Sequence, residues 1–249
     1  MRLIHGMCLV IIGMIFLVDT SWSDPALTIP NSIFDFGLVP QNSQVSCTFW
    51  LHSTGTDTLN ITDVKPGCGC TKTPLNKTVL ASGDSTDLEV IFSTGRRSGK
   101  QSKRPSIETN EGELAKYVEI KADVITAPDS TYPIRIAPYK FDISQFGDME
   151  VKERKFVIEN VSDQDLAISL VYMPEGIFRL DLPQKVKAGD SEGGKVTLRD
   201  DALDDEFEKS ITIEVNDDKH TRFSIPVKRT IRTVGLSTSS PANRGDASH

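Results

Sequence analysis

The sequence predicts an all-β protein built from two tandem antiparallel β-sandwiches. Short stretches rich in β-branched and aromatic residues recur between Gly, Pro, Asn and Asp residues, and no segment shows a sustained helical period. The chain also repeats itself, since Phe34 and Phe141 lie 107 residues apart and the same offset relates Phe49 to Phe156. Because each copy carries its own apolar set, the repeat predicts two domains rather than a solenoid.

The clearest strand signal lies at residues 45–51, where apolar and polar residues alternate with period two. This alternation directs Val45, Cys47, Phe49 and Leu51 into the core and Trp50 to the surface. Further strands are expected at residues 87–92 and 117–124 of the first copy, and at residues 155–159, 166–172, 211–215 and 223–228 of the second.

The motif Gly83-Asp84-Ser85 resembles a serine-hydrolase signature. The second copy carries Gly189-Asp190-Ser191 at the equivalent position. Gly and Asp favour turns, so both motifs are predicted to be turns that lead into strands rather than catalytic sites.

The domain boundary is expected near residues 126–131, where Ala127-Pro128-Asp129-Ser130 interrupts the strand pattern. This gives one domain over residues 24–126 and a second, divergent domain over residues 127–234. Residues 235–249 are rich in Ser, Pro, Asn and Gly and are expected to form a disordered tail.

Residues 1–23 have the features of a signal peptide. Arg2 supplies a positive charge, residues 7–18 are apolar, and Ser21-Trp22-Ser23 provides the small residues of a cleavage site. The apolar run is shorter than the roughly 20 residues that span a bilayer. We therefore expect export to the periplasm, cell surface or extracellular space, with cleavage before Asp24 and no membrane span in the mature chain. An uncleaved anchor is the alternative.

Composition narrows the range of partners. The net charge is −7, which argues against nucleic acid as a general partner because phosphate binding needs a basic face. The one strongly basic stretch, residues 96–104, is predicted to be a solvated hairpin loop.

An ordered series of motifs runs through the first copy: Phe34-Asp35-Phe36-Gly37-Leu38-Val39, Ser53-Thr54-Gly55, Pro66-Gly67-Cys68-Gly69-Cys70-Thr71 and Ile107-Glu108-Thr109-Asn110. Over residues 30–124 this series closely resembles the bacterial domain-of-unknown-function family 1573, which is related to the domains of Hydin-type ciliary proteins. The resemblance implies an immunoglobulin-like fold and a location in the cell envelope. It implies no reaction, since the activity of that family is undefined.

Cys68-Gly69-Cys70-Thr71 is the chemically unusual segment, and only the first copy has it, because Cys68 and Cys70 correspond to Glu175 and Ile177. Without residues 1–23 the chain keeps three cysteines, which cannot all pair within one molecule.

Three interpretations of the two cysteines stay open. A disulfide between Cys68 and Cys70 needs a tight bend, which Gly67 and Gly69 can supply, and would be easily reduced. Two thiolates on a flexible bend suit Cu(I), or half of a zinc site. Buried cysteines beside glycines can also simply pack the end of a strand.

No catalytic signature of a hydrolase, nucleotide-binding protein or metalloprotease is found in the sequence. The sequence thus predicts a non-catalytic binding or scaffold protein of the bacterial cell envelope, with an unidentified protein partner, no cofactor and an undefined oligomeric state. The alternative is a thiol-redox or Cu(I)-handling protein that uses Cys68 and Cys70.

Overall fold

The computed structural model describes residues 24–147 and 149–232, so the expected signal peptide and C-terminal tail lie outside the described residues. The predicted all-β fold is confirmed: in the part of the chain that the structure describes, the regular elements are strands and two short 3₁₀ helices, Pro128–Ser130 (η1) and Asp200–Ala202 (η2). Within these two ranges, no helix has the length and apolar character required to cross a membrane.

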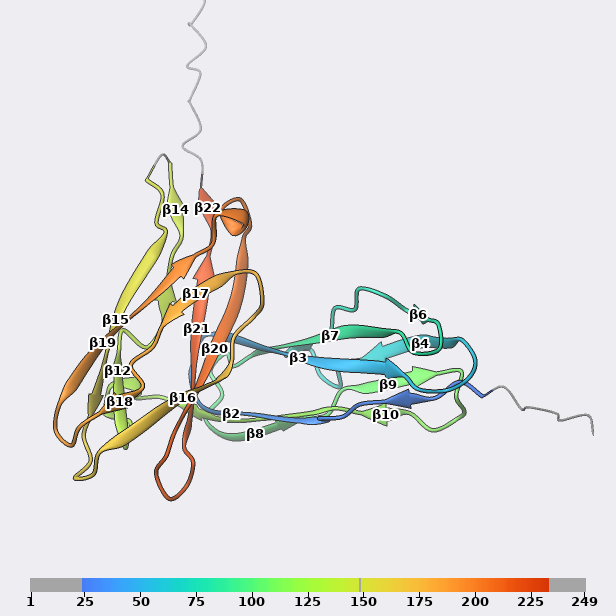
Figure 1. Ribbon diagram of the computed structural model, residues 1–249, viewed down its shortest axis with the longest axis horizontal. Helices are drawn as coiled ribbons and strands as arrows, with labels where there is room; N and C mark the ends of the chain where they lie inside the picture. The colour runs from blue at the N-terminus through green and yellow to red at the C-terminus, as the bar shows by residue number, and fades with distance from the viewer. Residues whose placement is uncertain (1–23, 148, 233–249) are drawn as a thin grey trace, which may run out of the picture.

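The strands fall into two sets, one before and one after η1 (Figure 1). The first half contains β1 (Leu27–Thr28), β2 (Ile33–Pro40), β3 (Gln44–Ser53), β4 (Leu59–Lys65), β5 (Thr71–Lys72), β6 (Val79–Leu80), β7 (Ser85–Ser93), β8 (Gly99–Lys103), β9 (Ser106–Thr109), β10 (Lys116–Tyr117) and β11 (Glu119–Ile125). The second half contains β12 (Ile134–Ala137), β13 (Phe141–Asp142), β14 (Gln145–Phe146), β15 (Glu153–Asn160), β16 (Leu166–Tyr172), β17 (Phe178–Asp181), β18 (Lys185–Val186), β19 (Ser191–Leu198), β20 (Phe207–Val215), β21 (Arg222–Arg229) and β22 (Ile231–Arg232).

Strand pairing repeats in the two halves. In the first half β3 lies between β1 and β7, and β5 pairs with β7; in the second, β15 lies between β12 and β19, and β17 pairs with β19. The opposite layers correspond too, because β4 pairs with β6 and β9, as β16 pairs with β18 and β20. Each half also has a parallel pair, β2 with β11 and β13 with β21. The sequence repeat is therefore a repeat of topology.

The halves differ where β8 and β9 take the place of the single strand β20. β20 pairs with both β21 and β16, whereas β8 pairs with β11 and β9 with β4. Pro105 lies between β8 and β9, and proline has no N–H to give to a ladder.

The prediction of a solvated loop at residues 96–104 is wrong for Gly99–Lys103, which pair with β11. Edge strands commonly carry exposed lysines, so basic composition did not reveal the strand.

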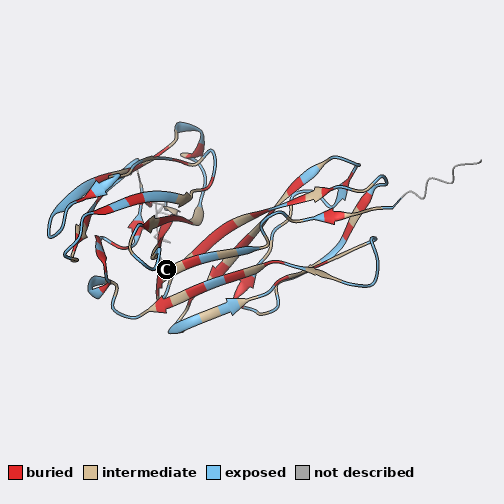
Figure 2. Ribbon diagram, turned by 60° about the horizontal axis from the view of Figure 1, so that its bottom comes forward, coloured by how far each residue is buried: buried red, intermediate tan, exposed pale blue. Residues whose placement is uncertain are grey.

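Among the described residues, the buried hydrophobic ones form two clusters, one in each half. Figure 2 shows buried positions along the strands of both halves. As the period-two pattern predicts, Val45, Cys47, Phe49 and Leu51 are buried, while Trp50 is 50% exposed. Both Gly-Asp-Ser motifs are turns, since Gly83 and Gly189 have φ angles of +85° and +72° and the serines begin β7 and β19.

One sheet runs through both halves, in the order β18-β16-β20-β21-β2-β11-β8. β2 reaches β21 in parallel register at Leu38 and Phe223, and β13, the counterpart of β2, pairs with β21 farther along. β2 therefore covers the part of the β21 edge that the short β13 leaves open. Gly37 permits this approach, because it has a φ of +63° and an added Cβ would lie 2.2 Å from the carbonyl oxygen of Arg222.

Polar contacts between β3, β7 and β20 also join the halves. The Ser210 hydroxyl accepts a hydrogen bond from the N–H of Ser46 and donates one to the carbonyl of Ser46, both at 3.0 Å. The Lys209 ammonium lies 2.6 and 2.7 Å from the two carboxylate oxygens of Glu89. Both pairs are buried or half-buried, so they fix β20 against the first half. That the two halves are separate, independently folding domains stays a prediction.

Candidate functional site

The Cys-Gly-Cys segment forms the turn between β4 and β5 at the end of the first hydrophobic cluster. Gly67 opens the turn with a φ of +78°. The carbonyl of Cys70 accepts a hydrogen bond from the N–H of Ser93 at 2.9 Å, and Thr71 pairs with Phe92 of β7. The second cysteine is thereby attached to the sheet, while the first is half-buried.

Cys68 and Cys70 form a disulfide, with their Cα atoms 5.3 Å apart. Of the two glycines expected to supply the bend, Gly67 adopts a left-handed conformation and Gly69 does not. Cys70 is only 9% exposed and belongs to the first cluster, whereas Cys68 is half-buried against it. Among the interpretations from the sequence, the structure therefore contains the disulfide, packed against the core.

Two features bear on the chemistry of this disulfide. The Thr71 hydroxyl lies 3.3 Å from the Cys68 sulfur and 3.9 Å from the Cys70 sulfur, so it can donate a hydrogen bond to a Cys68 thiolate. Cys68 is also the more exposed of the two residues, so we expect an external thiol to attack its sulfur. While the bond is closed neither sulfur is a thiolate, and Cu(I) binding would require its reduction first. Across residues 24–147 and 149–232, no three His, Cys, Asp or Glu side chains form a metal-binding group.

Cys47, the third cysteine of the described chain, is free and fully buried on β3. Burial, with a smaller contribution from Glu89, raises the pKa of its thiol well above the usual range. The folded protein therefore keeps this proton at a pH where an unfolded cysteine loses it.

This difference predicts that stability falls with alkaline pH. Above about pH 8.5, where an unfolded thiol ionises, the free energy of unfolding should decrease by up to about 1.4 kcal/mol per pH unit from Cys47 alone. Urea unfolding between about pH 8 and pH 10 measures the slope, and Cys47→Ala should flatten it. Equal slopes for the two proteins would contradict the assignment. Burial raises the pKa of Tyr172 to about 12, so its ionisation lowers the free energy of unfolding only from about pH 10 upward, where an unfolded tyrosine ionises.

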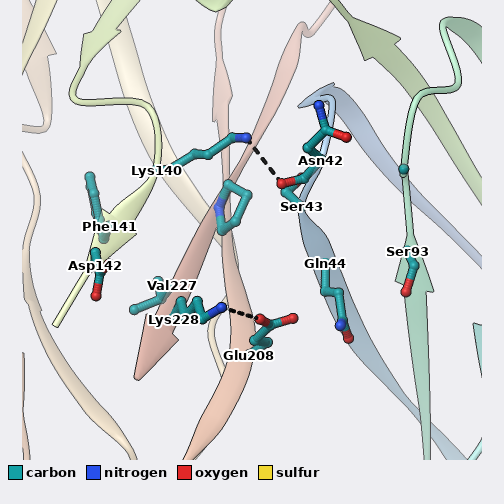
Figure 3. Close-up of a pocket in the computed structure, with 12 residues that line it drawn as sticks. Asn42, Ser43, Gln44, Ser93, Lys140, Phe141, Asp142, Glu208, Val227 and Lys228 are labelled. Atoms are coloured by element: carbon teal, nitrogen blue, oxygen red, sulfur yellow. Dashed lines mark hydrogen bonds and ion pairs between the residues drawn. The ribbon is translucent and has the colours of Figure 1, made fainter. Parts of the chain in front are cut away.

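A cavity of about 420 Å³ lies at the junction between the halves (Figure 3). Lys140 donates hydrogen bonds to the carbonyls of Gln41 and Asn42 at 2.6 and 3.2 Å, and Lys228 pairs with Glu208 at 3.1 Å. Partial burial lowers the pKa of Lys140. Lys140 and Lys228 are thus already bound by groups of the protein. We therefore interpret this cavity as part of the junction between the halves and not as a ligand site.

A second concave surface, of about 450 Å³, lies where residues 171–177 face β3 and β7. We call it the Trp50 cleft; its main residues are Trp50, Asp87 and Glu89 from the first half and Tyr172, Met173 and Glu175 from the second. The sequence indicated an exposed Trp50 but gave no sign of the opposite wall. That wall includes Glu175 and Ile177, the residues that correspond to Cys68 and Cys70.

Three solved structures illustrate a low level of similarity to this chain. A protein of unknown function from Porphyromonas gingivalis W83 is 14% identical, with a TM-score of 0.35 over 82% of this chain and 98% of that one. The PapD-like domain 7 of human CEP192 is 12% identical, with a TM-score of 0.34 over 48% and 99%. The VesB protease of Vibrio cholerae is 16% identical, with a TM-score of 0.32 over 40% and 32%. Likeness at this level says nothing about function.

No curated protein matches the chain. The sequence model of the family described as "Protein of unknown function (DUF1573)" matches residues 27–124. The match runs from the first residue of β1 into β11 and includes the Cys-Gly-Cys turn. Residues 27–124 are thus a domain of the DUF1573 family, as their resemblance to it predicted.

Proposed function

We propose that this chain is an exported, non-catalytic protein of the bacterial cell envelope that acts as a binding or scaffold module. It would consist of two immunoglobulin-like domains, residues 24–126 and 127–234, of which the first is of the DUF1573 type. Binding would take place at sheet edges and at the surfaces between strands, as is common for all-β modules.

The way in which the halves are joined is the observation that carries this proposal. A scaffold has to hold its binding surfaces in a fixed relation. The pairing of β2 with β21, the Ser210 contact with Ser46 and the Lys209–Glu89 ion pair all serve that purpose. Arranged in this way, side chains of both halves contribute to one surface, the Trp50 cleft.

Export is tested by expressing the full chain in a bacterial host, fractionating the cells and measuring the intact mass. We expect a protein in the periplasm or the medium that begins at Asp24 and is lighter by two hydrogens for the Cys68–Cys70 disulfide. A control that lacks residues 2–23 should stay in the cytosol. A wild-type chain that keeps residues 1–23 and remains in the cytosol would refute the proposal.

The alternative is a thiol-redox or Cu(I)-handling protein. The unequal exposure of Cys68 and Cys70, and the Thr71 hydroxyl beside Cys68, are the observations that favour it. In such a protein an external thiolate would attack the Cys68 sulfur, forming a mixed disulfide and releasing the Cys70 thiolate. A second thiol of the same reductant would then release Cys68, leaving two reduced cysteines and one oxidised dithiol.

The double substitution Cys68→Ser with Cys70→Ser separates the two functions. A disulfide that closes so small a ring contributes about 1–2 kcal/mol in the chain-entropy model, so the variant should fold. A scaffold should keep its binding with both serines present. A thiol protein should lose exchange with a small dithiol and Cu(I) protection of its reduced cysteines, whereas Cys47→Ala should keep both.

A further inference from the structure

We propose that the Trp50 cleft binds an extended segment of another protein, one that carries a lysine or arginine two residues away from apolar residues, on the same face of the strand. This inference rests on the proposed binding function and names the surface that performs it. Three observations carry it: an open strand edge, an exposed aromatic ring and two carboxylates that have no cationic partner among the described residues.

The open edge belongs to β3. In an antiparallel ladder, successive residues direct their backbone groups to opposite sides of the strand. The N–H of Ser46 points away from β7, since it donates to Ser210 of β20. Thr48 and Trp50 have the same parity, so their N–H and C=O groups also face away from β7.

Neighbouring elements leave this edge free. β1 pairs with β3 only at Ser53 and His52, and it cannot continue along β3 because Pro30 follows shortly after it. Within the described part of the chain, the backbone groups of Thr48 and Trp50 therefore have no hydrogen-bond partner. An extended segment can add to such an edge as a further strand.

The apolar side chains of the cleft favour apolar residues in the bound segment. Trp50 is 50% exposed, which is high for a tryptophan on a strand that is otherwise largely buried. Val171, Tyr172 and Met173 form the facing wall, and the Tyr172 hydroxyl lies 3.1 Å from that of Thr48. Alternate side chains of an added strand would lie against this wall and the indole ring.

The negative charge of the cleft favours a bound segment that carries a positive charge. Lys209 is already engaged by both oxygens of Glu89, so that pair is close to neutral. Asp87 accepts two hydrogen bonds from the uncharged amide of Asn76. Neither Asp87 nor Glu175 forms an ion pair with any described side chain, which leaves two negative charges for a basic residue of the partner.

Fluorescence of Trp50 provides the test. The chain has two tryptophans, so Trp22→Phe makes Trp50 the only one whether or not residues 1–23 are removed. The probe is a capped peptide with valine, lysine and valine at alternate positions and serine between them, so that all three face the cleft; we call it the valine–lysine peptide, and it is added to the exported full chain. We expect a saturable change in Trp50 emission, little response to the same peptide with glutamate in place of lysine, and at least about tenfold weaker binding when two consecutive central nitrogens of the valine–lysine peptide are methylated.

Variants locate the binding. Asp87→Asn and Glu175→Gln should each weaken binding of the valine–lysine peptide by about two- to fivefold at low salt. The matched changes Asp163→Asn and Glu192→Gln, at exposed sites of the second half, should leave it unchanged.

Three outcomes would overturn the proposal: no change in emission, an equal response to the glutamate peptide, or indifference to methylation. Self-association of the protein that Glu175→Gln abolishes would also overturn it, because the occupant would then be a second copy. If export and cleavage hold while the peptide fails, the surface is wrong and the proposed function stands; if export fails, the proposed function falls by itself.

Discussion

Replacing Arg229 with methionine is expected to lower the free energy of unfolding by about 3–5 kcal/mol. Arg229 is fully buried at the end of β21, where its guanidinium donates hydrogen bonds to the carbonyls of Ile143 and Leu203 and to the side chain of Gln145. Methionine fills much of the space but donates nothing, so buried carbonyl groups lose their partners. Each unsatisfied group costs about 1–3 kcal/mol, which makes this a large effect for one residue.

Urea unfolding monitored by circular dichroism measures the loss at Arg229. Arg154→Met is the matched control, since Arg154 is exposed on β15 and its replacement should change stability by less than about 0.5 kcal/mol. Arg229→Lys should recover only part of the stability, because an ammonium cannot reach all the carbonyls that a planar guanidinium serves. A methionine variant as stable as the control would mean that these hydrogen bonds are not needed.

Gly37→Ala is expected to destabilise the protein by about 3–5 kcal/mol, and to do so at the junction. The new Cβ would lie 2.2 Å from the carbonyl oxygen and 2.5 Å from the carbonyl carbon of Arg222. Both are backbone atoms, so the clash cannot be relieved by a side-chain movement. The positive φ of Gly37 adds a conformational cost, and β2 should move away from the start of β21.

Gly83→Ala separates the two contributions at Gly37. Gly83 also has a positive φ, but nothing lies within 4 Å of the Cβ that would be added there. It should therefore show only the conformational cost, about 1–2 kcal/mol. Hydrogen exchange should further show faster exchange of the β21 amides near Phe223 in Gly37→Ala and not in Gly83→Ala. The same effect in both variants would contradict the role of Gly37 in joining the halves.

Local patterns predicted the strands and their faces. Period-two alternation placed Cys47 and Phe49 in the core and Trp50 outside, because a strand turns successive side chains to opposite faces whatever its neighbours are. The repeat predicted a repeated topology for the same reason, since equivalent apolar patterns fold into equivalent layers. The same reasoning, carried one residue farther, would have placed Arg229 on the inner face of β21 with Phe223, Ile225 and Val227.

Composition was a poorer guide at the strand edges. Gly99–Lys103 was expected to be a loop because it is basic and polar, but its backbone pairs with β11. Side-chain polarity reports exposure rather than backbone pairing, and an edge strand is exposed on its outer side. The Cys-Gly-Cys turn shows a related ambiguity, because two cysteines at this spacing allow several states and only the local backbone path brings the two sulfurs together.

The sequence was enough to establish the all-β class, the repeated strand pattern and the membership of residues 27–124 in the DUF1573 family. It was also enough to show that Cys68 and Cys70 have no counterpart in the second copy. All of these depend on residues close together in the chain or at a fixed offset. The shared sheet, the Ser210 contact with Ser46 and the Trp50 cleft were decided by the tertiary structure alone. Each joins residues of different halves, and such pairings depend on how two folded surfaces fit together, which no pattern within a single strand encodes.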